Sequence, residues 1–176
     1  MSTINFDFMG ADETDAASEY FTSPTAETST DVVASANGLL IAAGSRVQLL
    51  TGINFNAKGN MSAEPVVGSN TYADIAEGMV DVDGQFTALF QDATLRDYFI
   101  DETEIGLTVV LAASGAAAAD FVAFTMPRVK VGSADGDDGQ KSIVRTFSFT
   151  ALENTAGGSG TDTDASTLVI QDSQAA

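Results

Sequence analysis

Two stretches in the middle of the chain alternate apolar and polar residues, and this alternation limits the possible fold more than any other feature. Over residues 47–58 the apolar and small side chains fall on one face, with Leu50 as the exception. Over residues 78–90 the same period recurs. The polar face of this second stretch carries Asp81, Asp83, Gln85 and Thr87. A period of two residues is typical of a strand with one packed and one wet face, so the sequence predicts a mainly β fold.

Other segments extend this prediction and add one helix. The spacing of apolar residues over 94–100 predicts a short helix, which Asp92 can cap. Pro127 is expected to end or bend the strand that precedes it. Further strands are predicted over residues 4–8, 105–112, 121–126, 143–151 and 167–170. Six or seven antiparallel strands with hairpin-length joins predict a β-sandwich or barrel with one short flanking helix.

The residue types present exclude most catalytic and metal-binding chemistry. The chain has no His and no Cys, so it lacks the commonest general base and the usual zinc ligands. The acidic loop that starts at Asp135 fails the EF-hand pattern, because Gly139 and Thr146 occupy ligand positions, and a solvated hairpin loop is favoured. The carboxylates of residues 101–104 are interpreted as a solvated turn rather than a glycosidase pair, since the chain has no Trp and only three Tyr. We therefore expect no enzyme activity, no cofactor and no metal.

The charge of the chain is strongly negative and unevenly placed. It has 25 acidic and 7 basic residues, and all the basic residues lie between Arg46 and Arg145. A net charge of −18 disfavours binding to nucleic acid and to anionic membrane surfaces. Residues 16–37 are rich in Ser, Thr and Ala. The sequence therefore predicts an N-terminal strand and extended arm over residues 1–36, followed by a β-sandwich domain over residues 37–176.

Seven short segments follow one another in an order that carries more information than each segment alone. They are NGLLI (37–41), LTGINF (50–55), PVVGSNTYADI (65–75), VDGQFTALFQD (82–92), MPRVKV (126–131), RTFSFTAL (145–152) and TLVIQDS (167–173). Together they resemble the tail-tube proteins of long-tailed bacteriophages, and the resemblance runs from Asn37 to Ser173. Similar phage proteins are often longer, with a second related domain before this one.

The resemblance implies a structural subunit that assembles with copies of itself into stacked, hexameric rings. Strands of each copy would line an inner barrel around a DNA channel, and the inner tube of type VI secretion shares this plan. The implied partners are further copies, other phage tail proteins and DNA as unbound cargo, without a membrane. The implied location is the virion tail, after synthesis in the host cytoplasm. The alternative is another non-catalytic β-sandwich module that acts at a surface or in binding.

Two sets of residues follow from this resemblance as candidate functional sites. The wet face of the second alternating stretch is the candidate channel wall, where negative charge would keep DNA from adhering. Its residues are Asp81, Asp83, Gln85 and Thr87. The long connection between the two alternating stretches is the candidate contact between rings. Its residues are Lys58, Met61, Glu64, Pro65 and Val66.

Overall fold

The computed structural model describes residues 3–10, 17–18, 23, 35–69, 71–89, 93–116, 119–137, 143–155 and 165–173 of the 176. These residues form eleven strands, one α-helix and one short 3-10 turn. The elements are η1 Ser35–Asn37, β1 Leu39–Ala42, β2 Ser45–Val47, β3 Leu50–Lys58, β4 Ser62–Ala63, β5 Ile75–Ala76, β6 Asp81–Leu89, α1 Thr94–Ile100, β7 Ile105–Ala112, β8 Phe121–Val131, β9 Asp135–Asp137, β10 Val144–Leu152 and β11 Val169–Asp172.

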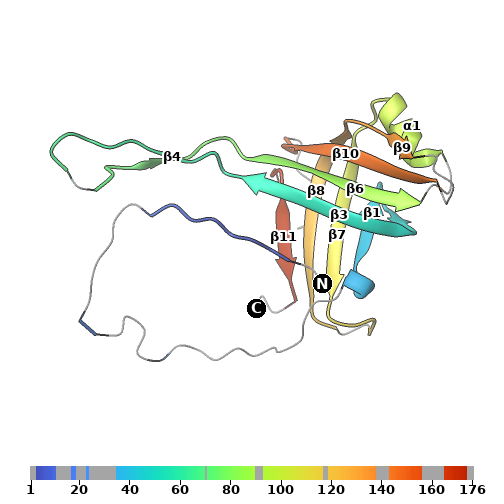
Figure 1. Cartoon of the computed structure of the whole chain (residues 1–176), viewed down its shortest axis with the longest axis horizontal. Helices are drawn as coiled ribbons and strands as arrows, with labels where there is room; N and C mark the ends of the chain where they lie inside the picture. The colour runs from blue at the N-terminus through green and yellow to red at the C-terminus, as the bar shows by residue number, and fades with distance from the viewer. Residues whose placement is uncertain are drawn as a thin grey trace.

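Nine of the strands form one antiparallel sheet that folds over itself. Its order is β2-β1-β7-β8-β10-β6-β3, and β11 and β9 pair with β8 and β10 beside this path. β8 makes the fold-over possible, because its first half pairs with β11 and its second half with β10. Figure 1 shows β3, β6 and β10 crossing over β1, β7 and β8. The predicted antiparallel β fold with one helix is confirmed. The path ends at β2 and β3, which do not pair with each other, so the described strands do not close a barrel.

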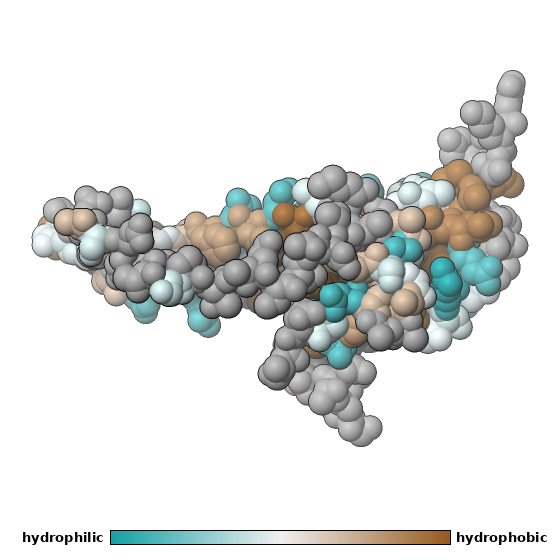
Figure 2. Space-filling view, turned by 90° about the horizontal axis from the view of Figure 1, so that it is seen from below, coloured by the Kyte–Doolittle hydropathy of each residue, from teal (hydrophilic) through white to brown (hydrophobic). Residues whose placement is uncertain are grey.

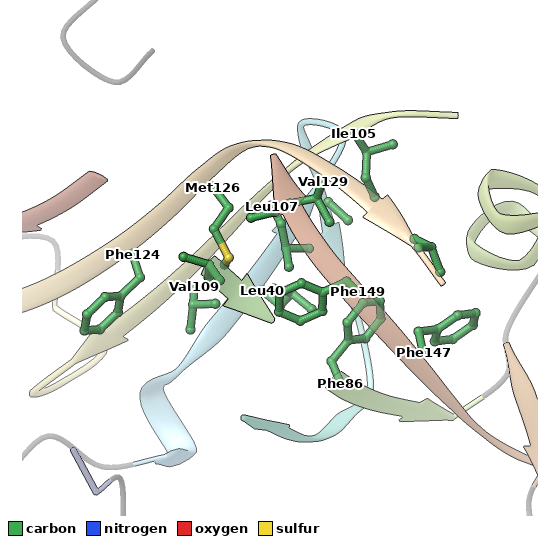
Figure 3. Packing of buried hydrophobic residues seen from close by; sticks show 14 residues of the cluster. Leu40, Phe86, Ile105, Leu107, Val109, Phe124, Met126, Val129, Phe147 and Phe149 are labelled. Atoms are coloured by element: carbon green, nitrogen blue, oxygen red, sulfur yellow. The ribbon is translucent and has the colours of Figure 1, made fainter. Parts of the chain in front are cut away.

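The hydrophobic core lies where the two halves of the sheet face each other. In β6, Val82, Phe86 and Ala88 are buried, as the alternation predicted. Phe86 stacks on Phe147 of β10 with ring centroids 5.1 Å apart. Figure 3 shows the packing of the whole cluster. Its members are Leu40, Ala42, Val82, Phe86, Ile105, Leu107, Val109, Phe124, Met126, Val129, Val131, Phe147, Phe149 and Ala151.

The first alternating stretch is two strands rather than one. The chain turns between β2 and β3, where Leu49 has a φ of 53°. The register then shifts between Leu50 and Gly52, so β3 carries one extra residue, and the Thr51 hydroxyl donates to the Thr87 carbonyl at 2.9 Å. Such a bulge changes which face the following residues present. It lets Leu50 pack against the core, which explains why Leu50 breaks the alternation.

Pro127 bends a strand and does not end it. β8 continues to Val131, and two residues of β8 lie between the partners of Ile105 and Leu107, where β7 has only Gly106. Pro has no N–H for the ladder, and a bulge is a place where a strand tolerates this. The helix occupies Thr94–Ile100 as predicted. Its N-cap position is Ala93, and the predicted cap Asp92 lies outside the described residues.

The strand predicted near the N-terminus is absent from the described structure. Residues 3–10 are in no strand, and the side chains of Phe6 and Phe8 are 71% and 91% exposed. An alternating segment becomes a strand only when it finds a ladder partner and a face to pack on. Residues 3–10 therefore form no strand in the single chain, and the N-terminal strand and extended arm over residues 1–36 stay a prediction.

Close packing around Gly84 makes this residue sensitive to substitution. A Cβ at Gly84 would come within 2.7 Å of both the Phe149 ring and the Phe55 side chain. We expect Gly84→Ala to lower the free energy of unfolding by about 1–3 kcal/mol, because neighbouring core groups must move. Urea denaturation measures this change. Gly52→Ala is the matched control, since no atom lies within 4 Å of its added Cβ, and an equal loss in both variants would contradict the prediction.

Candidate functional site

Residues 59–80 form a projecting arm that extends the β3–β6 hairpin away from the sheet. Figure 1 shows the arm reaching well beyond the remaining strands, with the short β4–β5 ladder along it. Four of the five predicted contact residues, Met61, Glu64, Pro65 and Val66, lie on the arm and are exposed. The fifth, Lys58, ends β3 at the base of the arm and is also exposed. The structure thus brings the predicted set together on one protruding element.

The base of the arm is held by specific contacts. Asn60 adopts a φ of 46°, and its side-chain amide donates to the Met79 carbonyl at 2.9 Å and to the Asp81 carboxylate at 2.7 Å. Gly78 lies directly against the backbone of Asn60, where any Cβ would overlap the Asn60 carbonyl. These contacts tie the two sides of the hairpin together where they leave the sheet.

The surface of the arm is apolar to a degree that sequence reasoning missed. The exposed large apolar residues of the arm are Met61, Val66, Val67, Tyr72, Met79 and Val80. Figure 2 shows apolar residues along the arm between its hydrophilic ones. Val67 and Tyr72 lie in the predicted connection but were not named, because single apolar residues in a loop form no period. Val80 was predicted on the packed face of the strand over residues 78–90, but β6 begins only at Asp81, and Met79 and Val80 are exposed. A run of apolar side chains on one protruding element is typical of an interaction surface.

The predicted channel-wall residues share one face of β6. Asp81, Asp83 and Gln85 are exposed, and Thr87 is half-buried. The neighbouring strands continue this polar face, because directly opposed residues of antiparallel strands share a face. The residues opposite on β3 and β10 are Asn54, Asn56, Lys58, Thr146, Ser148 and Thr150. We call these ten residues the polar face.

The polar face is mostly neutral. Lys58 lies opposite Asp81 in the ladder, and Asn56 and Thr150 lie on either side of Asp83. The Thr87 and Thr146 hydroxyls are 3.2 Å apart and hydrogen-bonded to each other. Amide and hydroxyl groups thus make up most of this surface, with two carboxylates and one ammonium at the end nearest the arm.

The carboxylates after α1 take part in ion pairs. Glu104 accepts two hydrogen bonds from the Arg128 guanidinium at 2.7 Å and 2.9 Å, and Glu102 lies 3.4 Å from Lys130. The Arg128 hydrogen bond holds the pKa of Glu104 below its ordinary value, and Glu104 raises the pKa of Arg128. Both side chains of each pair are solvent-accessible, so each pair contributes little to stability. In the described part of the chain no group of three acidic side chains is arranged to hold a metal ion.

No helix among the described residues is long and apolar enough to cross a membrane.

Two solved structures have a similar fold. The sheath/tube terminator of the PVC extracellular contractile injection system, in its extended state, aligns with a TM-score of 0.61 over 80% of this chain and 96% of that one, at 7% identity. The SPP1 tail tube aligns with a TM-score of 0.51 over 65% of this chain and 72% of that one, at 13% identity.

Comparison with curated protein sequences finds no significant match. The family described as "Phage tail tube protein" matches residues 1–151, which is most of the 176 residues. This match agrees with the antiparallel sheet and the one short helix that the described residues form. The chain therefore belongs to the phage tail tube protein family.

Proposed function

We propose that copies of this chain assemble into rings, six to a ring, and that the rings stack to form the tube of a virion tail. The observation that carries this proposal is the projecting arm, an apolar element for which the sheet itself offers no cover. The main path of the sheet also ends at β2 and β3, two edge strands at which another copy can pair. Pairing between copies removes exposed strand edges, which otherwise favour aggregation.

The arm is the element best suited to join one ring to the next. It extends from the sheet, so its tip reaches a neighbour that the sheet does not touch. Burial of its apolar side chains against a neighbouring copy is favourable, because it removes apolar surface from water. Residues 1–36 are proposed as a second inter-ring contact, supported by the exposed Phe6 and Phe8 of the segment that the structure describes.

The polar face is proposed as the wall of the channel. A wall of amides and hydroxyls with a few carboxylates offers phosphate groups little positive charge to bind, so DNA passes as cargo and does not adhere. The SPP1 tail tube, which has a similar fold, supports the assembly of such a tube. The other phage tail proteins at the ends of the tube are the remaining proposed partners.

Imaging the purified protein tests the assembly. We expect rings or tubes in cryo-electron micrographs and a concentration-dependent sedimentation coefficient in moderate salt. A protein that sediments as a monomer at micromolar concentration in every salt condition, with residues 1–36 intact, contradicts the proposal. The same result would favour the alternative of a non-assembling surface or binding module.

Reversing the charge of the polar face tests the channel wall. We expect Asp81→Lys with Asp83→Lys to leave the sheet folded, at a cost above the about 0.5 kcal/mol of an ordinary exposed substitution, because Asp81 accepts a hydrogen bond from Asn60 and lies opposite Lys58. Particles with this variant are expected to eject DNA more slowly and with a new dependence on salt, since the added ammonium groups contact phosphates. The matched control is Asp101→Lys with Asp172→Lys, which changes the net charge equally on exposed positions elsewhere. Equal ejection rates in both variants would place Asp81 and Asp83 outside the channel.

A further inference from the structure

A pocket of about 250 Å³ lies between α1, β2 and the adjoining ends of β6 and β10. Its apolar lining comes mainly from Val47, Leu95, Tyr98 and Phe147, and Arg46 and Arg145 also line it. Figure 3 shows Phe147 at the end of the core cluster that lies nearest the helix. Pockets that take drug-sized ligands usually measure about 300–1,000 Å³. This one is smaller, and its size suits one or two side chains of a protein.

The pocket is basic in a chain that has few bases. It carries two of the seven basic residues of the protein. Arg46 is exposed, and in the described part of the chain it forms no ion pair. Residues 1–45, in contrast, contain seven acidic residues and no basic one. Charge complementarity with Arg46 at the edge of the pocket therefore favours the N-terminal part of another copy as the partner at this edge.

Strand β2, which borders the pocket, has a free edge. Among the residues that the structure describes, β2 pairs with β1 alone, and it ends the path of the sheet. Ser45 and Val47 lie opposite the buried residues Ala42 and Leu40, so they share the inner face and line the pocket. Arg46 lies opposite Ile41, on the other face. A strand added to this edge would place alternate side chains toward the pocket and the residues between them beside Arg46.

The N-terminal segment has the pattern that this edge requires. Phe6 and Phe8 point to the same side, with stacked rings whose centroids are 6.3 Å apart. Both rings are exposed, and Asp7 between them falls on the opposite face of an extended chain. Figure 1 shows residues 3–10 far from α1 of the same chain, so the segment is available to a neighbour.

We propose that residues 4–9 of one copy add as a strand to the free edge of β2 in a second copy. Phe6 and Phe8 then enter or border the pocket beside Ser45 and Val47, and Asp7 pairs with Arg46. This inference rests on the proposed self-assembly, and it identifies the surface that receives the N-terminal segment. It also explains why the alternating segment finds no ladder partner in the single chain.

Disulfide trapping tests the contact, because the protein has no cysteine of its own. One tagged copy carries Asn5→Cys or Met9→Cys, and an untagged copy carries Gln48→Cys, next to Val47 on the pocket. Met9 lies nearest Gln48 if the added strand is parallel to β2, and Asn5 does if it is antiparallel. After joint assembly and mild oxidation, we expect a tagged–untagged cross-link from one of the two donors. The matched control receptor is Gln171→Cys, which is also exposed but lies on β11.

The outcomes distinguish the proposed self-assembly from the proposed contact between residues 4–9 and β2. Selective cross-linking to residue 48 supports the contact. Tubes that form normally without selective cross-linking overturn this inference and leave the proposed function standing. A segment that folds back on its own chain yields no tagged–untagged product and also overturns it. Copies that never assemble overturn the proposed function and this inference with it.

Charge reversal gives a second readout. We expect Arg46→Glu in the receptor to abolish the cross-link, because it opposes the carboxylate of Asp7, and Asp7→Lys in the donor to restore it. Lys130→Glu is the control with the same change of charge on a solvent-accessible base outside the pocket. Equal cross-linking in the Arg46→Glu and Lys130→Glu receptors would overturn the assigned pairing.

Discussion

A chain that lacks residues 61–77 is expected to fold normally and to form no tubes. The deletion removes most of the apolar residues of the projecting arm, which are proposed to hold successive rings together. It joins Asn60 directly to Gly78, two residues that already touch across the base of the arm. Asn-Gly is among the strongest hairpin-forming pairs, and the remaining five-residue connection is a common hairpin length. The sheet should therefore close without strain.

Circular dichroism checks that the deleted chain folds, and electron micrographs check that it forms no tubes. The deleted chain should keep the β-sheet signal of the full chain and should appear as single subunits or separate rings. A milder variant, Val67→Ser with Met79→Ser, keeps the arm and removes two of its exposed apolar side chains. It should give tubes that fall apart at lower protein concentration than the native ones. Tubes of normal length from the deleted chain would show that the arm joins no rings.

Phe86→Ala is expected to destabilise the fold more than Gly84→Ala does. The Phe86 side chain is 1% exposed and its ring lies within 5.1 Å and 6.3 Å of the Phe147 and Phe149 rings, measured between centroids. Truncation removes apolar burial and leaves a cavity between the two halves of the sheet, which costs about 3–5 kcal/mol.

Urea denaturation followed by circular dichroism measures this loss. Phe99→Ala, on the helix, is the matched control, because Phe99 is 38% exposed and outside the core cluster. The free energy of unfolding that Phe99→Ala loses should be less than half of the loss in Phe86→Ala. Similar losses in the two variants would mean that the core does not centre on Phe86.

The alternation of apolar and polar residues predicted the strands that have one packed and one wet face, because burial of one face requires apolar residues at every second position. In β6 it identified both faces, and the helix and β7 have the predicted bounds. It failed where a neighbouring strand sets the geometry. The turn at Leu49 and the bulge opposite Gly106 depend on partners far along the sequence, which no local period reports. For the same reason the alternation around Phe6 and Phe8 did not indicate whether another strand lies beside this segment.

The candidate sites were predicted in part. Alternation placed Asp81 and Asp83 on one wet face, but their neighbours Asn56 and Thr150 became visible only with the register of the sheet. Four residues of the arm were identified through the resemblance to tail-tube proteins, while Val67 and Met79 were missed. The pocket beside Arg46 gave no sequence signal at all, because its walls come from β2, α1 and β10, which are distant in the chain.

The continuity of the arm with β3 and β6 has a mechanical consequence. A pull on the arm along its length loads these two strands parallel to their own axes. The hydrogen bonds that join β6 to β3 and β10 lie across that direction, and the three strands are paired along nearly their whole length. The load is therefore shared by many bonds in shear and does not open them one after another. A filament whose subunits are linked through such arms resists stretching with the full strength of its sheets.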